Sequence, residues 1–592
     1  MKLTENPTDI SRRKFMAVAG GAAGLAAMAA MGISPSDGEC SPNIAKIDAS
    51  EITSTENEVD VLVIGGGIAG LFAAVKAHDA GSSVMLVSKG RLGSSGQTPF
   101  AKGIFAFDPN TAKMSLDEYV ATVSRSAIGT NNPVYTRQTA EHSLARVNEL
   151  KEWGFFDSPI YNKSFNKPIK ERNIPVKERI VITHLIKENG RIAGAAGFSL
   201  NDEKIHFFKS KSVILCTGAG GFKPNGFPIC DLTHDGTVMA YEIGAKVTGK
   251  EWNDGHPGKS ENPAACYDGW GGVGGMFDQK PSVTGVGIRH DLGVDINYRA
   301  YKLGNPTTGG PGSKGPQQTV EGGPYRPAEF AESGGPPVDA PSGDGAPGGP
   351  PGGGKGQKGG PPPGFSNSPV GGSSAGMSIH KSEGLVPINE KCASNILGLY
   401  AAGDALGSYM AGAIYTQIGS SLAGSAVQGA VAGKAASEYS QDIDRPKMSK
   451  AAMKKVEDEI LAPLKREAGY SPAWVTQTLQ GIMIPNFILY VKKENLLKAA
   501  LAYVEELRDH HMPMLRAADL HELRLAFETR NMIISAEMKL KASIMRTESR
   551  CSHYRLDYPE VDTKNWNAWI NIFKGSDGSM KLEKQPFDNW PA

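Results

Sequence analysis

The stretch "VDVLVIGGGIAGL", residues 59–71, decides the fold. Its apolar first half, rich in valine and isoleucine, predicts a buried strand, and the residues that follow the glycines predict a helix over 71–80. In the pattern Gly65-x-Gly67-x-x-Gly70, the first glycine allows the tight turn and the second lets the backbone approach a pyrophosphate. The third allows close packing of helix on strand. The pattern therefore predicts a dinucleotide-binding unit.

A second strand, expected over 84–87, ends in Ser88-Lys89, where many dinucleotide folds place an acid for the ribose. Nicotinamide binding is therefore not the first expectation. A distant stretch, "GLYAAGDALG" over 398–407, predicts another strand that ends in a glycine turn with an acid, Asp404. This acid could bind the ribityl or pyrophosphate part of a cofactor. Two such distant segments predict FAD, an extended cofactor that both can hold.

Composition narrows the function classes. The chain has 592 residues, enough for two or three domains, and its net charge of +1 gives no hint of a nucleic-acid partner. The six cysteines are scattered with no C-x-x-C spacing, which predicts neither an iron–sulfur cluster nor an attached haem. No metal site is expected, and any redox chemistry must use a non-covalent or organic cofactor.

The first residues resemble an export signal. Ser11 to Met16, "SRRKFM", precedes a weakly apolar run and matches the twin-arginine pattern, which predicts a periplasmic protein. Further along, 304–376 is so rich in glycine and proline that it predicts an insertion with little apolar core. The expected organisation is a signal peptide at 1–33, a linker at 34–57, a cofactor domain at 58–250 and 377–440, a capping (substrate) domain at 251–376 that contains this insertion, and a C-terminal helical domain at 441–592.

Further motifs carry a family resemblance: "VSKG", "SSGQTPFAKG", "LCTGAGG", "THDGTVMAYEIGAK" and "IGSSLAGSAVQGAVAGKAA". With the two stretches above, they resemble the fumarate reductase/succinate dehydrogenase flavoprotein family over about 59–438 and 500–575. The resemblance implies an α/β fold with a Rossmann-like FAD-binding domain, an inserted capping domain and a C-terminal helical domain. It implies FAD bound by Gly65, Gly67, Ala69, Gly70, Ser88, Lys89, Gln97, Thr98, Gly103, Gly218, Asp235, Asp404, Ser421 and Leu422.

FAD is expected to be non-covalent. Covalent family members attach it through a histidine, and the aligned position here is Gln97 or Gly96, neither of which can form that bond.

Two stretches imply catalytic residues. "EWNDGHPG", 251–258, resembles the family's "EFxQFHPTG", whose histidine helps to bind the substrate carboxylate, and this implies His256. A hydrogen-bonded loop histidine is the alternative. "MRTESRCSHYRLDYPEVDTKNW", 545–566, resembles the family's "ESRGAHxRxDYP" and implies Arg550, His553 and Arg555. With Trp566 it is somewhat closer to the adenylylsulfate reductase version. An ion-paired seam between domains is the alternative for this stretch.

The resemblance implies an exported FAD-dependent oxidoreductase that passes a hydride to an activated C=C bond of an unsaturated carboxylic or carbonyl compound, or the reverse. A separate electron partner, such as a cytochrome or quinol-linked protein, is expected. Thr416 falls where fumarate reductases carry an arginine, so fumarate itself is not the expected substrate. The alternatives are sulfur chemistry like that of adenylylsulfate reductase, which export disfavours, and a non-catalytic flavin electron carrier.

Overall fold

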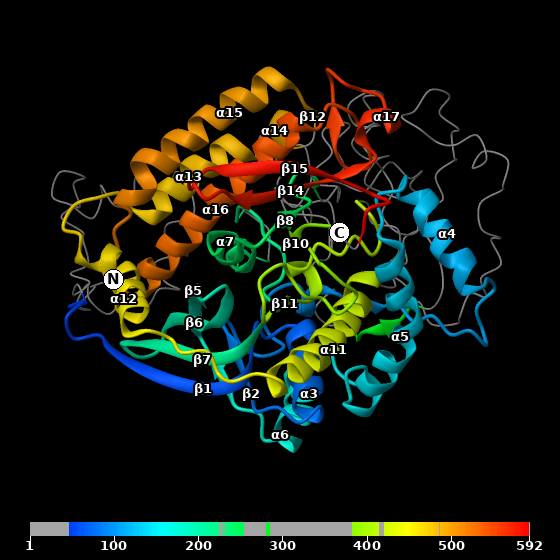
Figure 1. Ribbon diagram of the computed structural model, residues 1–592, viewed down its shortest axis with the longest axis horizontal. Coiled ribbons are helices and arrows are strands. Elements are labelled where there is room, and N and C mark those ends of the chain that lie inside the picture. The colour runs from blue at the N-terminus through cyan, green and yellow to red at the C-terminus, as the bar shows by residue number, and fades with distance from the viewer. Residues whose placement is uncertain are drawn as a thin grey trace, which may run out of the picture. The chain divides into compact units, whose positions relative to one another are not determined.

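The computed structural model describes residues 47–223, 229, 231–253, 280–284, 382–413, 419–484, 486–489 and 491–590. The elements described below belong to the unit Asp48–Ala592. Its described strands form a seven-stranded sheet in the order β4-β2-β1-β7-β6-β5, with β11 also paired to β7 (Figure 1). These strands are β1 (Thr53–Ile64), β2 (Val84–Ser88), β4 (Val176–Glu178), β5 (Ile180–Glu188), β6 (Arg191–Ser199), β7 (Lys204–Leu215) and β11 (Leu399–Ala401).

The sheet combines parallel and antiparallel pairing. β4, β2, β1, β7 and β11 run parallel, and Val61 of β1 lies between Val84 of β2 and Ser212 of β7. β5 and β6 continue from β7 as an antiparallel meander. The end of β1, Val61–Ile64, is buried, as expected for a central parallel strand that is covered on both faces. The expected α/β class is confirmed.

Two helices from distant parts of the chain pack side by side near the glycine turn. They are α3 (Ile68–Asp79) and α11 (Ser420–Gln441), and they lie next to each other in Figure 1. Their backbones approach closely because a Cβ on Gly429 would lie 2.3 Å from the Ala69 carbonyl oxygen, and one on Gly433 would lie 2.4 Å from that of Ala73. The small-residue sequence of α11 is thus explained by helix packing.

The expected linker boundary is wrong. β1 begins at Thr53, and Thr53 to Asn57 already pair with β7 from Lys204 to Phe208. Most side chains in this half of the strand are exposed or half-buried, which explains their polar character. This polar composition is also typical of a linker, and for that reason the sequence does not indicate a strand here. The corrected start of the sheet is Thr53 rather than residue 58.

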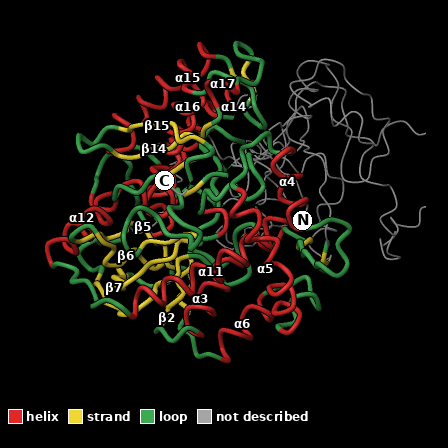
Figure 2. Tube along the Cα trace, turned by 45° about the vertical axis from the view of Figure 1, so that its right-hand side comes forward, coloured by secondary structure: helices red, strands yellow, loops and turns green. Residues whose placement is uncertain are grey.

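The segment expected as a C-terminal helical domain begins with helices but ends with strands. Its helices are α12 (Lys450–Lys465), α13 (Pro472–Met483), α14 (Asn486–Leu489), α15 (Glu494–Glu506), α16 (Leu520–Met545) and α17 (Thr563–Trp566), with the shorter helical turns η4 (Leu507–His511) and η5 (Met512–Met514). Figure 2 shows α14, α15 and α16 grouped together. The strands β12 (Val491–Lys492) and β13 (Tyr554–Arg555) pair with each other.

A β-hairpin follows these helices within the segment expected as a C-terminal helical domain. β14 (Ala568–Lys574) and β15 (Met580–Pro586) pair antiparallel, and β14 also pairs with β8 (Val247–Thr248), which pairs in turn with β10 (Gly384–Leu385). Within β14, Ile570 and Ile572 are fully buried, and this burial holds the hairpin on the rest of the protein. The hairpin thus returns to the cofactor domain.

The remaining described elements are short connections and peripheral helices. They are η2 (Thr98–Phe100), β3 (Gly103–Ile104), α4 (Leu116–Ser126), α5 (Pro133–Glu152), α6 (Asn162–Glu171), α7 (Asp235–Glu242), β9 (Ser282–Val283) and η3 (Gly403–Ala405). Of the expected capping domain, 251–376, only 251–253 and 280–284 lie within the described residues. Among the helices described, none is both long and apolar enough to cross a membrane.

Candidate functional site: a dinucleotide pocket and a buried ionic seam

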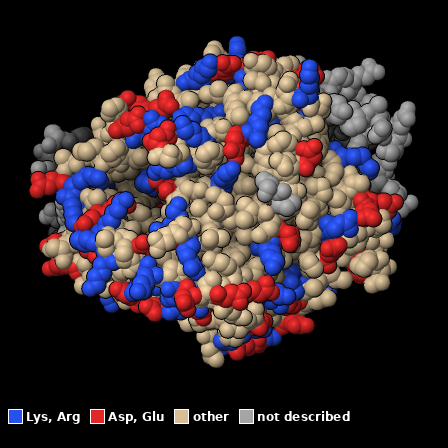
Figure 3. Space-filling model, in the orientation of Figure 1, with Lys and Arg blue, Asp and Glu red and all other residues tan. Residues whose placement is uncertain are grey.

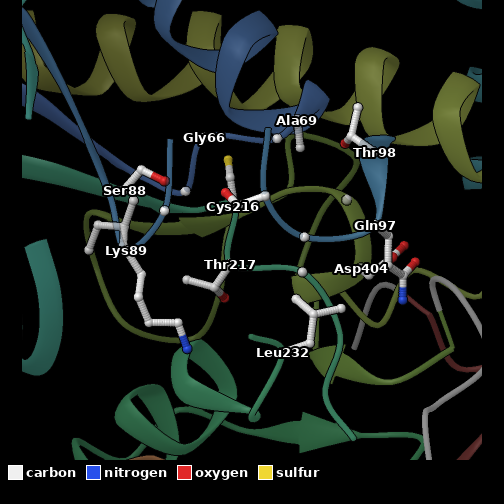
Figure 4. Close-up of a pocket in the computed structure, with 18 of the residues that line it drawn as sticks. Gly66, Ala69, Ser88, Lys89, Gln97, Thr98, Cys216, Thr217, Leu232 and Asp404 are labelled. Carbon is white, nitrogen blue, oxygen red and sulfur yellow. The ribbon is translucent and has the colours of Figure 1, made fainter. Parts of the chain in front are cut away.

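A pocket lies where the predicted glycine turn meets the ends of β2, β7 and β11. In Figure 4, Ser88 and Lys89 lie at one side of it and Gln97 and Asp404 at the other, with Thr217 between them. Ten residues predicted to bind the cofactor line this pocket: Gly65, Gly67, Ala69, Ser88, Lys89, Gln97, Thr98, Gly218, Asp235 and Asp404. One pocket thus contains residues from both of the distant segments.

The three glycines of the turn have distinct surroundings. A Cβ on Gly65, whose φ is +124°, would lie 2.1 Å from the Cys216 carbonyl oxygen, and a Cβ on Gly70 would lie 1.9 Å from that of Gly65. Both positions therefore require glycine for the turn and for helix–strand packing. A Cβ on Gly67 would meet only the Thr98 hydroxyl, at 3.2 Å, and Gly67 lines the pocket. The space at Gly67 is what a pyrophosphate would use.

The pocket fits a dinucleotide cofactor. α3 begins at Ile68 with no side-chain cap from Gly67, so its amide donors and helix dipole favour an anionic group here. The Thr217 hydroxyl is buried without a hydrogen-bond partner among the described residues, although Thr217 lines the pocket. A bound cofactor would give this oxygen a partner.

Four residues predicted to bind FAD do not line the pocket. Gly70 packs against the turn itself, Gly103 lies in β3, Leu422 is buried in the core, and the Ser421 hydroxyl is buried without a described partner. Binding roles for Gly103, Ser421 and Leu422 stay predictions. Sequence reasoning missed Asp231, Met239 and Ser425, which do line the pocket. For Asp231 a signal existed, since it is an acid two residues before the Thr233–Gly236 motif.

Comparisons with known proteins agree with this pocket. Residues 60–162 match the family described as FAD binding domain, and residues 476–590 match the one described as fumarate reductase flavoprotein C-term. An uncharacterized FAD-dependent oxidoreductase of Methanocaldococcus jannaschii is 25% identical over 90% of this chain and 99% of its own length. A polypeptide of the fumarate reductase (CoM/CoB) of Methanothermobacter marburgensis is 25% identical over 85% of this chain and 95% of its own.

The fold has solved counterparts. A chain of Mycobacterium smegmatis Sdh1 in complex with UQ1 has a TM-score of 0.66 and 22% identity, and the match covers 91% of this chain and 95% of that one. The pocket and the matches together define a flavoprotein whose cofactor is FAD. More particularly, the chain is an FAD-dependent oxidoreductase of the fumarate reductase/succinate dehydrogenase flavoprotein type.

The charged stretch 545–566 forms a buried seam between α16, the hairpin and the end of β8. Arg546 is fully buried, donates to Glu251 at 2.8 Å and to Glu548 at 2.8 Å, and its guanidinium lies 4.6 Å from the ring centre of Trp252. Arg550 binds Glu548 through two nitrogen atoms, at 2.8 and 3.1 Å. The interdomain seam is therefore made of paired charges, one of the two arrangements expected for this stretch.

Arg555 and His553 belong to the same seam. Arg555 binds Asp557 through two nitrogen atoms and donates to the Ser543 carbonyl oxygen at 2.7 Å. His553 accepts a hydrogen bond from Lys492 Nζ at Nδ1, 2.8 Å away, and its Nε2–H donates to the Arg546 carbonyl oxygen at 3.3 Å. Burial, followed by the charges of Lys492 and Arg546, holds the pKa of His553 well below its usual value. His553 is therefore neutral.

The catalytic roles predicted for Arg550, His553 and Arg555 stay predictions. None of the three lines the dinucleotide pocket described above, and all are buried with protein partners. His256 and Thr416 lie outside the described residues. The described residues contain no group of three or more histidines, cysteines or carboxylates arranged to bind a metal.

A second buried cluster adjoins the pocket wall at His234, which sequence reasoning missed. His234 has a left-handed backbone, φ +63°, and its Nδ1–H donates to Glu383 Oε1 at 3.0 Å. Lys250 Nζ lies 2.6 Å from the same oxygen, and Lys539 Nζ lies 3.5 Å from Oε2 of Glu383. Burial, only partly offset by the Glu383 charge, lowers the pKa of His234 to about 4. The imidazole is therefore neutral in the folded protein.

The protein is expected to lose stability between pH 6.5 and 5 through His234. In this window the unfolded chain binds a proton at His234, whose ordinary pKa is 6.5, whereas the folded protein does not because its pKa is about 4. The stabilisation is complete above pH 6.5 and falls with pH by about 1.4 kcal/mol per unit. His234→Asn, which tolerates the left-handed backbone, should reduce the slope in urea unfolding by this amount, whereas His553, whose pKa is also held below its usual value, should keep its own contribution.

The control is His510→Asn, because the His510 side chain is 68% exposed. It should keep the slope of the parent protein. Equal slopes for the parent and the His234→Asn variant would contradict the assignment of this pH dependence to His234. Protonation of Glu383 in the unfolded chain contributes little to the slope in this window, because its ordinary pKa of 4.5 lies below pH 5.

Proposed function

We propose that the protein, after twin-arginine export to the periplasm, reduces an activated C=C bond of an unsaturated carboxylic acid with electrons from a separate partner protein. Bound FAD supplies the hydride. The observation that carries the substrate class is an excess of buried basic side chains over carboxylates in the described part of the seam. The proposal is also supported by the likeness to the methanogen fumarate reductase polypeptide along most of both chains.

The surplus is visible in the described part of the seam. Three fully buried carboxylates, Glu251, Glu383 and Glu548, and the more exposed Asp557 and Glu494 face six buried basic side chains: Lys250, Lys492, Lys539, Arg546, Arg550 and Arg555. Lys492 has no carboxylate within 4 Å among the described residues, because its Nζ contacts the Glu251 carbonyl oxygen and His553. Burial, followed by the charge of Lys539, holds the pKa of Lys492 well below its usual value. A bound carboxylate would favour the charged ammonium, so the seam suits a substrate carboxylate.

The seam also lies next to the stretch expected to contribute to the substrate site. Lys492 and Lys539 both bind the segment 250–253, which leads directly to the predicted His256. His256 would provide one further donor to the carboxylate. Thr416 cannot replace the arginine that fumarate reductases carry at this position, because threonine cannot bind a second carboxylate through two nitrogen atoms. A mono-acid or aryl enoate therefore suits this protein better than fumarate does.

With a reduced dye as electron donor, periplasmic extracts should reduce a mono-acid or aryl enoate better than fumarate. Loss of one charge-assisted bond to a desolvated carboxylate costs about 2–4 kcal/mol, so fumarate should react roughly 30- to 1000-fold more slowly in kcat/KM. Lys492→Met should raise KM for the enoic acid but not for a neutral enone of the same shape. Steady-state kinetics with the purified protein measure both effects.

His256→Ala is the companion variant, and it should lower kcat/KM for the enoate while FAD stays bound. Fumarate as the best acceptor would refute the substrate class, and an equal effect of Lys492→Met on acid and enone would refute the anion site. Dye-linked activity confined to the cytoplasmic fraction would refute export alone.

A further inference from the structure

One face of α16 carries a buried polar stripe that faces the cofactor domain. The stripe consists of Glu528, Asn531, Ser535 and Lys539, which are three or four positions apart and therefore lie on one side of the helix. All four are buried, with exposed fractions of 0–3%. The surface charges of both signs in Figure 3 are interspersed, whereas this stripe lies inside the protein. Buried polar groups on a helix require partners, which here come from the cofactor domain.

The first half of the stripe binds two charged residues of the FAD pocket. Glu528 Oε1 lies 2.8 Å from Lys89 Nζ, and Lys89 Nζ lies 2.7 Å from Asp235 Oδ2. Asn531 Nδ2 donates to the other oxygen of Asp235 at 2.8 Å. Lys89 and Asp235 line the pocket, whereas Glu528 and Asn531 do not. The helical segment thus sets the positions of two pocket side chains from outside the pocket.

The second half of the stripe holds the seam behind the pocket wall. Lys250 Nζ donates to Ser535 Oγ at 3.1 Å, and Lys539 Nζ donates to the carbonyl oxygens of Lys250 and Trp252, each at 3.2 Å. From Glu528 to Lys539 the helix rises by about 16 Å, so the contacts extend well beyond one residue pair. α16 is therefore docked on the cofactor domain by polar contacts along this whole length.

The charges at the pocket end depend on each other. Burial alone would lower the pKa of Lys89, but Asp235, Glu528 and Asp231 raise it above the usual lysine value. Lys223 also pairs with Glu528. If α16 moved away, Glu528 would lose two cations and Asp235 would lose the amide that orients it. The pocket would then no longer present Lys89 and Asp235 in the described positions.

We propose that the polar stripe of α16 couples FAD binding to docking of the helical segment, so that each stabilises the other. Glu528 and Asn531 act as positioning residues that hold Lys89 and Asp235 for the cofactor. Since coupling of two binding equilibria is reciprocal, the factor by which docking strengthens FAD binding equals the factor by which FAD strengthens docking. The proposal rests on FAD binding and is independent of the substrate proposed above.

The test compares two glutamates of the same helix in the full-length protein. Glu528→Gln should raise the Kd of FAD about tenfold, measured by flavin fluorescence during release from the holoenzyme and reconstitution. In the parent protein, FAD should slow the hydrogen exchange of α13 and α16. In Glu528→Gln, the factor by which FAD slows this exchange should be about tenfold smaller. A structural role alone would speed exchange with and without FAD equally.

Glu537→Gln is the matched control. The Glu537 side chain is 4% exposed, and it pairs with Arg508 and Lys541, each at 2.5 Å, within the helical segment. This variant should speed exchange in α16 but leave the Kd of FAD unchanged. Asn531→Ala, a smaller change, should weaken FAD binding in the same direction as Glu528→Gln. An unchanged Kd in Glu528→Gln and Asn531→Ala, or an equal rise in Glu537→Gln, would overturn the coupling.

Discussion

Gly67→Ala is expected to give a folded protein that has lost most of its FAD. Its backbone, φ −81° and ψ −174°, suits alanine, and the new Cβ would meet only the Thr98 hydroxyl. The methyl group would instead occupy pocket space that the pyrophosphate needs. Overpacking of this kind costs about 1–3 kcal/mol, which corresponds to roughly 5- to 150-fold in the Kd of FAD.

The contrast is Gly70→Ala in the same turn. Its Cβ would lie 1.9 Å from the backbone oxygen of Gly65, and a backbone contact cannot be relieved by a side-chain rotation. This variant should fail to fold, or unfold well below the melting temperature of the parent, whereas Gly67→Ala should melt with the FAD-free parent. Circular dichroism and flavin absorbance per chain separate the two. Full FAD content in Gly67→Ala would show that this glycine does not border the cofactor.

Arg546→Met should cause the largest loss of stability among single changes in the seam. Arg546 is fully buried between Trp252 and Trp566, and its removal leaves Glu251 without an ion pair among the described residues. An uncompensated buried charge costs about 3–5 kcal/mol of unfolding free energy. Urea unfolding followed by tryptophan fluorescence measures the loss.

The control for this prediction is Arg137→Met. Arg137 pairs with Asp117 on the surface, where the two side chains are 41% and 84% exposed, so its removal should hardly move the urea midpoint. Glu251→Gln combined with Arg546→Met should recover part of the stability, because it removes the stranded charge. A loss for Arg546→Met as small as that for Arg137→Met would contradict the buried pairing.

The glycine turn and Asp404 were predictable because their signals are local. A strand, a tight turn and a helix follow one another within 59–80, and each glycine has a role that its neighbours in sequence define. The turn at 403–405 carries the same kind of signal. Local patterns of this kind predicted the FAD cofactor, and Gly65, Gly67 and Asp404 from the two distant segments line one pocket.

The polar stripe of α16 was not predictable in the same way. Glu528 binds Lys89, which is 439 positions away in the chain, and the sequence near either residue contains no pattern that predicts this pair. A glutamate and an asparagine on a helix normally indicate an exposed face. The hairpin β14–β15 carries a local signal of its own, since Asp577-Gly578 lies between two short strands.

Because β8 pairs with β10, the point where the chain leaves the cofactor domain lies next to the point where it returns. Thr248 lies opposite Gly384, and a Cβ on Gly249 would lie 1.7 Å from the Ser382 carbonyl oxygen. Whatever is inserted between these strands therefore starts and finishes at one place on the cofactor domain. Each doubling of such an insertion adds only about 0.6 kcal/mol of closure entropy. The length of the inserted segment can therefore change at small energetic cost while the pairing of β8 with β10, and the cofactor domain that carries it, stay the same.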